Sequence, residues 1–268
     1  MRTCWIRRIG YIPFKRMRIL LVNDDGIDAQ GIHALIAALH GRHELVVMAP
    51  DGQRSGFSQS INYMRAIPVE KRVISGYKDI DAYAVGGSPA DCVKLALLRF
   101  FPDVDMVVSG INDGENFGRD ICYSGTFGAA LEGAVYGKKS VAISCMNERG
   151  HAQFEFAADF LAGFLDENDL SDMPENTVVN INIPDIIENG AVKGVKLTRQ
   201  AGRCYEEGYD VTQDGGKLLC QLISTRDIPQ EEGTDVRAVM DGYVSISVLK
   251  YDRTDERGNK VLEGIMSK

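Results

Sequence analysis

The chain has 268 residues, of which 44% are hydrophobic and 25% charged, and its formal net charge at pH 7 is −8. This composition is that of a globular protein with enough apolar residues for a full core. The negative charge argues against a main partner that is a nucleic acid polymer or an anionic membrane. No apolar run approaches the roughly 20 residues of a membrane span. The six cysteines form no C-x-x-C pair, which favours free thiols and a cytoplasmic location.

The first 16 residues differ from the rest of the chain. They hold five basic residues and no acidic one, and they lack the continuous apolar stretch of a signal peptide. A basic leader or targeting arm is one interpretation. We favour a translation start at Met17, directly before the first predicted strand. Residues 1–16 are therefore treated as an N-terminal extension, and residues 17–268 as the folded domain.

Apolar strand patterns alternate along the chain with helical patterns. In chain order the sequence predicts strand 18–22, helix 31–40, strand 44–49, helix 88–100, strand 104–109, helix 126–136, strand 140–144, helix 152–165 and strand 177–183. The second helix opens with Ser88 as N-cap and Pro89 in its first turn. Such alternation predicts an α/β fold with a mostly parallel sheet covered by helices on both faces. Ligands of such sheets bind at the carboxyl ends of the strands.

The pattern changes after about residue 190. Residues 192–197 and 243–249 have strand patterns, whereas residues 202–216 are rich in Gly, Tyr and acids. We interpret this region as a β-rich C-terminal hairpin arm or extension for contacts between subunits.

Two adjacent carboxylates, Asp24 and Asp25, follow the wholly apolar run 19–22. Two like charges about 4 Å apart repel by about 4 kcal/mol at an effective dielectric constant near 20. Such a pair raises the pKa of one carboxyl group, and a bound cation removes the penalty. The segment Asn23–Gly26 is therefore interpreted first as a metal site and second as a polar turn.

Three further loops carry polar groups that fit the same chemistry. They span residues 49–56, 109–116 and 123–126. Their carboxylates, hydroxyl and carboxamides are hard oxygen donors, which suit Mg²⁺ or Mn²⁺. Ser124, Gly125 and Thr126 open a helix, where hydroxyls and free N–H groups can bind an oxyanion. A metal beside an anion site suggests phosphate-ester hydrolysis. Each loop alone is equally explained as a turn or an N-cap, and only their joint placement favours the functional interpretation.

Ordered motifs over most of the chain resemble the SurE family of metal-dependent 5′/3′-nucleotidases. They are Met17–Gly26, Ala49–Asp51, Arg54–Gly56, Gly87–Val93, Val107–Asn112, Tyr123–Thr126, Asn180–Pro184, Gly233–Asp235 and Asp241–Ile246. The resemblance implies a Rossmann-like α/β domain whose C-terminal extension is exchanged between the subunits of a homodimer or homotetramer. It implies a phosphomonoesterase that hydrolyses nucleoside monophosphates as a 5′-nucleotidase, with 3′-nucleotides and short polyphosphate as further substrates in some members.

The resemblance also implies the site residues. Four would bind one divalent ion, Mg²⁺ or Mn²⁺, in each subunit: Asp24, Asp25, Ser55 and Asn112. Four would bind phosphate: Asn116, Ser124, Gly125 and Thr126. Asp24 and Asp25 would be the catalytic pair, and Asp25 is our choice for the group that deprotonates the attacking water. The acids at 113 and 115 replace a small residue and a proline that are commoner in the family, and we expect them to alter the tolerance for substrate charge.

The alternative from another class is a non-hydrolytic, receiver-like signalling domain, which also ends its first strand in paired acids around Mg²⁺. That interpretation requires a phosphoacceptor Asp after a later strand and a more distant Lys. A dinucleotide-dependent oxidoreductase is disfavoured because the chain has no G-x-G motif.

Overall fold

The computed structural model describes residues 15–147, 153–185, 192–226 and 231–267. Residues 1–14 of the predicted extension lie outside these ranges, so the start at Met17 stays a prediction. Among the described residues, no helix combines the length and apolar content that crossing a bilayer requires.

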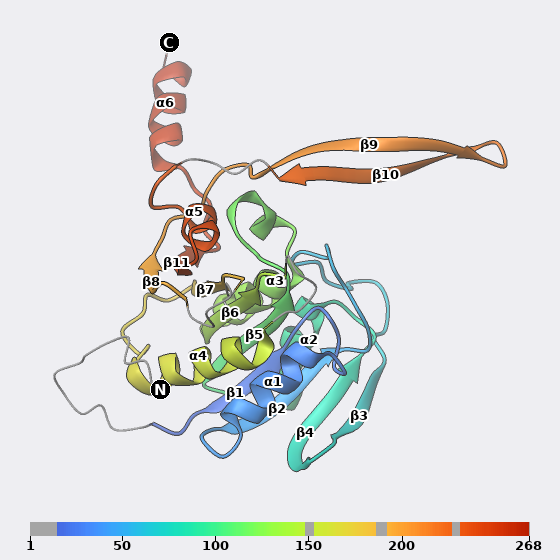
Figure 1. Ribbon diagram of the computed structural model, residues 1–268, viewed down its shortest axis with the longest axis vertical. Helices are drawn as coiled ribbons and strands as arrows, with labels where there is room; N and C mark the ends of the chain where they lie inside the picture. Colours follow the sequence, from blue (N-terminus) through green and yellow to red (C-terminus); the bar gives the residue numbers. More distant parts are fainter. Residues whose placement is uncertain (1–14, 148–152, 186–191, 227–230, 268) are drawn as a thin grey trace.

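A sheet of nine strands forms the centre of the molecule (Figure 1). The strands are β1 (Arg18–Val22), β2 (Glu44–Pro50), β3 (Val69–Ile74), β4 (Tyr77–Val85), β5 (Met106–Asp113), β6 (Lys139–Cys145), β7 (Thr177–Ile183), β8 (Val195–Leu197) and β11 (Val244–Lys250). Their order is β3-β4-β2-β1-β5-β6-β7-β11-β8. The six strands from β4 to β7 are parallel, whereas β3 and β11 are antiparallel to their inner neighbours. The predicted mostly parallel α/β fold is confirmed.

Helices cover both faces of this sheet, and the side chains of β1 show why its sequence is continuously apolar. The helices are α1 (Gln30–Leu39) and α4 (Phe154–Glu167) on one face, and α2 (Pro89–Leu95) and α3 (Gly125–Val135) on the other. Ile19 and Leu21 pack in the core beneath α1 and α4, while Leu20 and Val22 pack beneath α2 and α3. A strand buried on both faces needs an apolar residue at every position.

Three local features differ from the prediction. The helix predicted at 88–100 is α2 followed by a π-helical turn, Ala96–Phe100. The strand predicted to end at residue 109 continues as β5 to Asp113, because Asn112 and Asp113 resume pairing with β6 after an irregularity. The hairpin of β3 and β4 was not predicted, since it lies at the edge of the sheet and much of its sequence is polar and exposed.

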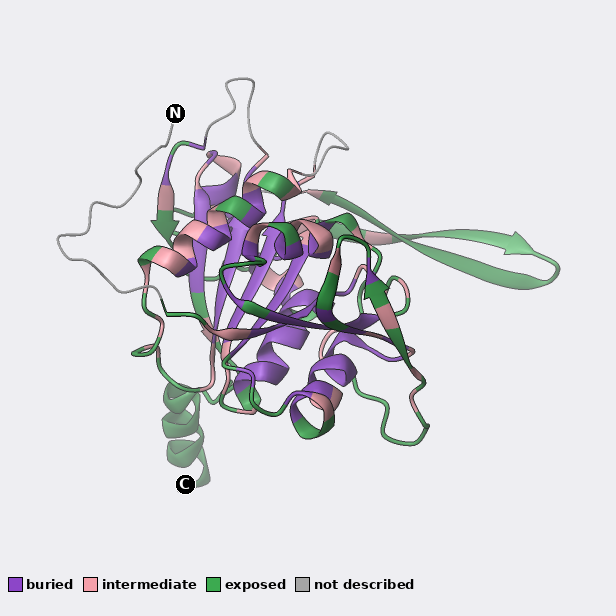
Figure 2. Ribbon diagram, turned by 90° about the horizontal axis from the view of Figure 1, so that it is seen from below, coloured by how far each residue is buried: buried purple, intermediate pink, exposed green. Residues whose placement is uncertain are grey.

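The C-terminal region contributes both to the sheet and to two projecting elements. β9 (Tyr205–Asp214) and β10 (Lys217–Arg226) form a separate antiparallel hairpin, which we call the arm. The short helix α5 (Asp235–Met240) precedes β11, and α6 (Glu256–Met266) follows it. Figure 1 shows the arm and α6 extending away from the sheet, and Figure 2 shows both exposed over most of their length, with the base of the arm partly buried. The expected C-terminal strands are therefore present, and the domain division itself stays a prediction.

Candidate functional site

The carboxyl edge of the central strands brings the polar segments together. β1 pairs in parallel with β2 on one side and β5 on the other, so the three strands end at one edge. The Arg54 N–H donates to the Asp24 carbonyl at 2.6 Å, and the Asp113 N–H donates to the Asp25 carboxylate at 3.3 Å. From the start of α3, the Thr126 hydroxyl donates to the Asp24 carboxylate. All four predicted segments therefore meet at residues 23–26.

Asn23 and Gly26 close the turn that presents the two carboxylates. The fully buried Asn23 donates through Nδ2 to the Gly26 carbonyl at 2.8 Å and accepts from the Gly26 N–H at 3.2 Å. Gly26 has a φ of +105°, where a side chain would be strained. Asn23 therefore has a structural role, which leaves Asp24 and Asp25 to interact with a ligand.

Asp24 is buried and Asp25 half-buried, and neither has a cationic partner among the described residues. Burial raises the pKa of Asp24 to about 6. The hydrogen bond from Thr126 partly opposes this rise, and the negative charge of Asp25 adds to it. Burial also raises the pKa of Asp25. In the part of the chain that the structure describes, no Lys, Arg or His forms an ion pair with either carboxylate. Asp51 differs, because the Arg54 guanidinium lies 2.5 Å from its carboxylate.

Ser55 lies on a loop that is fastened to the same edge. Its neighbour Arg54 donates to the Asp24 backbone, while Ser55 itself is exposed. Further along the loop, the Ser58 N–H donates to the Tyr123 carbonyl at 3.1 Å. This bond joins the Ser55 loop to the start of α3 and leaves the Ser55 hydroxyl accessible to a ligand.

Asn112 is held in an orientation that presents its oxygen. It lies near the end of β5, in register with Ser144 of β6. Its Nδ2 donates to the Gly114 carbonyl at 2.8 Å. Because the amide nitrogen is engaged on that side, Oδ1 lies on the other side of the carboxamide, where it can serve as an oxygen ligand.

Asn116 is buried in a polar cluster that the sequence analysis did not assign. Its N–H donates to Asn182 Oδ1 at 2.8 Å, and its carbonyl accepts from Asn180 and Asn182 at 2.9 Å each. Its side chain donates to Ser144 Oγ at 2.8 Å. The detectable signal was the alternation of Asn with Val and Ile in strand 177–183, which places amides on a buried face. This cluster fixes the position of Asn116 over the ends of β6 and β7.

The start of α3 approaches Asp24 closely. Ser124 is the N-cap, and its Oγ accepts from the Phe127 N–H at 2.9 Å. A Cβ on Gly125 would lie 2.8 Å from the Asp24 Cβ, so only glycine allows this approach. Both predicted phosphate-binding hydroxyls thus have partners within the protein, and the hydroxyl of the fully buried Thr126 is directed at Asp24. The N–H groups of the first turn and the helix dipole are the features suited to an anion.

The donor set fits a hard divalent cation. Asp24, Asp25, Ser55 and Asn112 offer carboxylate, hydroxyl and carboxamide oxygens, the ligands that Mg²⁺ and Mn²⁺ prefer. Within the described ranges, no cluster of three or more His, Cys, Asp and Glu side chains could hold a metal. A cation bound here would therefore depend on the serine and asparagine as well as the two aspartates.

The fold is that of an α/β protein with a mostly parallel sheet, and the candidate site lies at the carboxyl edge of its strands, where ligands of such sheets bind. Residues 19–207 match the family model described as survival protein SurE, and the chain belongs to this family. It is 42% identical to the 5′-nucleotidase SurE of Syntrophomonas wolfei over 242 residues, covering 89% of this chain and 90% of that protein. It is also 42% identical to the 5′-nucleotidase SurE of Kosmotoga olearia, covering 87% and 92%.

A solved structure shows the same fold. The crystal structure of the SurE protein from Aquifex aeolicus superposes with a TM-score of 0.79 at 36% sequence identity, covering 93% of this chain and 99% of that one. The match extends beyond residue 207 and therefore includes C-terminal elements that lie outside the family model.

Proposed function

We propose that this protein is a divalent-metal-dependent 5′-nucleotidase that hydrolyses nucleoside monophosphates, with 3′-nucleotides as a second substrate class. The observation that carries the proposal is the buried Asp24 beside the half-buried Asp25 at the strand end. Neither has a cationic partner among the described residues, and Asp24 lies directly against the start of α3. A cation site beside an anion site suits a phosphate ester. The names of the relatives from Syntrophomonas wolfei and Kosmotoga olearia support the nucleotide as substrate.

In this proposal four side chains hold one Mg²⁺ or Mn²⁺ ion. They are Asp24, Asp25, Ser55 and Asn112. When bound, such an ion supplies Lewis acidity for the attack of water on phosphorus. Asp25 is less buried than Asp24, and in this proposal its carboxylate accepts the proton of the attacking water.

The phosphate would lie against the first turn of α3. The N–H groups of Gly125 and Thr126 point along the helix axis toward this end, and Ser124 caps the same turn. Asn116 is fixed by its buried hydrogen bonds and would complete the phosphate site with its carboxamide. The Thr126 hydroxyl is assigned a second role, which is to orient the Asp24 carboxylate.

The test is phosphate release from a panel of 5′- and 3′-nucleoside monophosphates and short polyphosphate, with Mg²⁺, Mn²⁺ or a chelator. We expect turnover with metal and none with the chelator. Turnover that survives complete removal of metal would contradict the metal dependence. Stable phosphorylation by acetyl phosphate without turnover would support the receiver-like alternative.

A homo-oligomer is part of the same proposal. The arm and α6 carry large apolar side chains that are exposed and lie outside the hydrophobic core. They are Tyr209, Val211, Leu218, Leu219, Leu222, Ile223, Val261, Leu262, Ile265 and Met266. Exposed apolar surface of this extent is typical of subunit interfaces. Sedimentation analysis should give a dimer or tetramer, and a monomer at micromolar concentration would contradict the proposal.

A further inference from the structure

The base of the arm is bound to the loop that leaves β5. Arg226, the last residue of β10, forms an ion pair with Glu115, and the Tyr205 hydroxyl donates to the same Glu115 carboxylate at 2.8 Å. A second ion pair, between Arg119 and Glu207, joins the arm to the next turn. The two pairs differ in burial, because the Glu115 side chain is 12% exposed and the Glu207 side chain 36%. The Glu115 contact is therefore the less solvent-screened of the two.

A short covalent and hydrogen-bonded path leads from Glu115 to Asn112. The carbonyl of Gly114 belongs to the peptide bond that precedes Glu115, and it accepts the Asn112 Nδ2 hydrogen bond at 2.8 Å. Gly114 has a φ of +124°, where the backbone is free of the restriction that a side chain imposes. Its N–H is fixed by the Cys145 carbonyl at 2.9 Å. The arm contacts of Glu115 therefore lie one residue along the chain from the carbonyl that orients Asn112.

We propose that Tyr205 and Arg226 are positioning residues of the site: through Glu115 they hold the Gly114 carbonyl, which orients the Asn112 carboxamide. The inference rests on the proposed metal-binding role of Asn112. It gives the arm a task in the chemistry of its own subunit, besides any contact with another subunit. The sequence predicts that Glu115 alters the tolerance for substrate charge. In the structure its charge is paired with Arg226.

The experiment measures Mn²⁺ binding without substrate, by electron paramagnetic resonance of the free ion, in the full-length protein. Glu115→Gln removes the charge that holds Arg226, and Tyr205→Phe removes one hydroxyl. We expect Glu115→Gln to weaken Mn²⁺ binding about tenfold, as removal of an outer-shell partner of a metal ligand does. Tyr205→Phe should weaken it less, because the ion pair with Arg226 remains.

The matched control is the other ion pair at the arm base. Glu207→Gln breaks the contact with Arg119 and leaves Glu115 and its partners in place, so Mn²⁺ binding should be unchanged. Thermal unfolding of each metal-free variant reports whether the fold is retained. Tyr205→Phe, which deletes a single oxygen atom, keeps the test decisive if Glu115→Gln does not fold.

The outcomes separate this inference from the proposed function. Mn²⁺ binding that is equal in the unaltered protein, Glu115→Gln and Tyr205→Phe would overturn the positioning role alone. Equal weakening by Glu115→Gln and Glu207→Gln would also overturn it, because attachment of the arm in general would then be responsible. Failure of the unaltered protein to bind Mn²⁺ would overturn the metal site and the positioning role together.

Discussion

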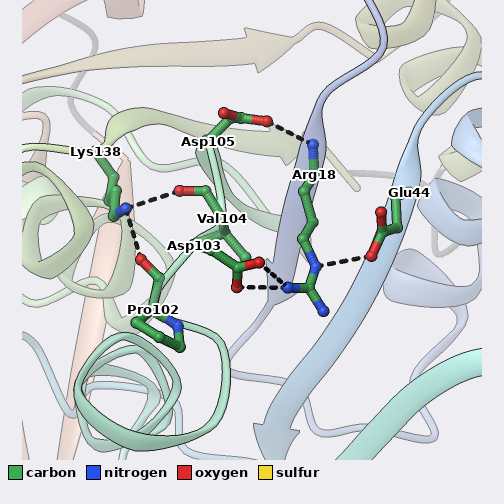
Figure 3. A network of polar contacts seen from close by, with 7 residues as sticks. All are labelled: Arg18, Glu44, Pro102, Asp103, Val104, Asp105 and Lys138. Atoms are coloured by element: carbon green, nitrogen blue, oxygen red, sulfur yellow. Dashed lines mark hydrogen bonds and ion pairs between the residues drawn. The ribbon is translucent and has the colours of Figure 1, made fainter.

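The charged residues at the two ends of β1 differ in whether they have partners of opposite charge. At its amino end, Arg18 forms ion pairs with Glu44 at 2.8 Å and with Asp103, and its N–H donates to Asp105 at 2.8 Å (Figure 3). Nearby, Lys138 donates to two backbone carbonyls of the same turn. Every drawn charge at this end has a partner within the protein.

At the carboxyl end, Asp24 and Asp25 lie together without a cationic partner among the described residues. The acidic groups around Arg18 are paired within the protein. A buried acid next to a second, half-buried acid costs stability when no cation is near, and such sites are commonly completed by a ligand. The contrast between the ends of one strand therefore separates structural charges from the candidate functional ones.

The largest expected effect comes from removing one charge at the carboxyl end. Asp24→Asn should lower kcat/KM for a nucleoside monophosphate by about a thousandfold, equivalent to about 4 kcal/mol of transition-state stabilisation. The physical reason is loss of a carboxylate from the proposed cation site. Asp103→Asn, at the amino end, is the matched control and should leave kcat/KM unchanged. Similar losses from both substitutions would remove the distinction between the two ends.

The pH dependence of stability should have opposite signs at the two ends. In metal-free protein the Asp24 pKa is about 6 against an ordinary 3.8, so the folded state binds this proton more tightly than the unfolded state. The contribution to stability is therefore present below about pH 4 and is lost as pH rises through 6, a change of about 3 kcal/mol. The measurement is the free energy of urea unfolding as a function of pH with chelator present. Asp24→Asn should abolish the loss between about pH 4 and pH 7.

Asp103 provides the opposite case. A hydrogen bond from its own backbone and the Arg18 side chain lower its pKa. Its contribution is thus present above the ordinary pKa and is lost as pH falls through the lowered one. The difference in unfolding free energy between the unaltered protein and Asp103→Asn should therefore shrink as pH falls. A difference that instead shrinks as pH rises, as expected for Asp24, would contradict the comparison.

A smaller effect should follow from the hydrogen bond that Thr126 donates to Asp24. Thr126→Val removes the hydroxyl while nearly preserving shape, so the Asp24 pKa should rise by about one unit, since a hydrogen bond to a charged group contributes about 1.5 kcal/mol. Mn²⁺ binding should then weaken about fivefold at pH 6, where Asp24 of the unaltered protein is already half protonated, and little at pH 8.5. Thr126→Ser retains the hydroxyl and should behave as the unaltered protein. Weakening that is independent of pH would contradict the proposed cause.

The smallest effect is expected at the amino end. Arg18→Met removes ion pairs whose acidic partners, Glu44 and Asp103, are largely exposed. Such pairs contribute at most about 1 kcal/mol to the free energy of unfolding. Urea unfolding should show a loss of that size, and nucleotidase activity should be unchanged. A large loss of activity would mean that the two ends of β1 are coupled.

Some elements could be predicted closely because their signal is local. The strands at 18–22 and 177–183 coincide with β1 and β7, since each is a continuous or alternating apolar run bounded by polar residues. The acidic pair was placed correctly at the end of β1 for the same reason. The edge hairpin of β3 and β4 was missed, because an exposed strand has no strong apolar pattern.

By itself the sequence determined the α/β alternation, the order of the polar segments and the presence of two adjacent acids after a buried strand. Only the tertiary structure decided which groups those acids meet. Thr126 is 102 residues from Asp24 in the chain, and Arg226 is 111 residues from Glu115. Apolar periodicity reports which face of a segment is buried, whereas such contacts depend on strand order and register across the whole sheet.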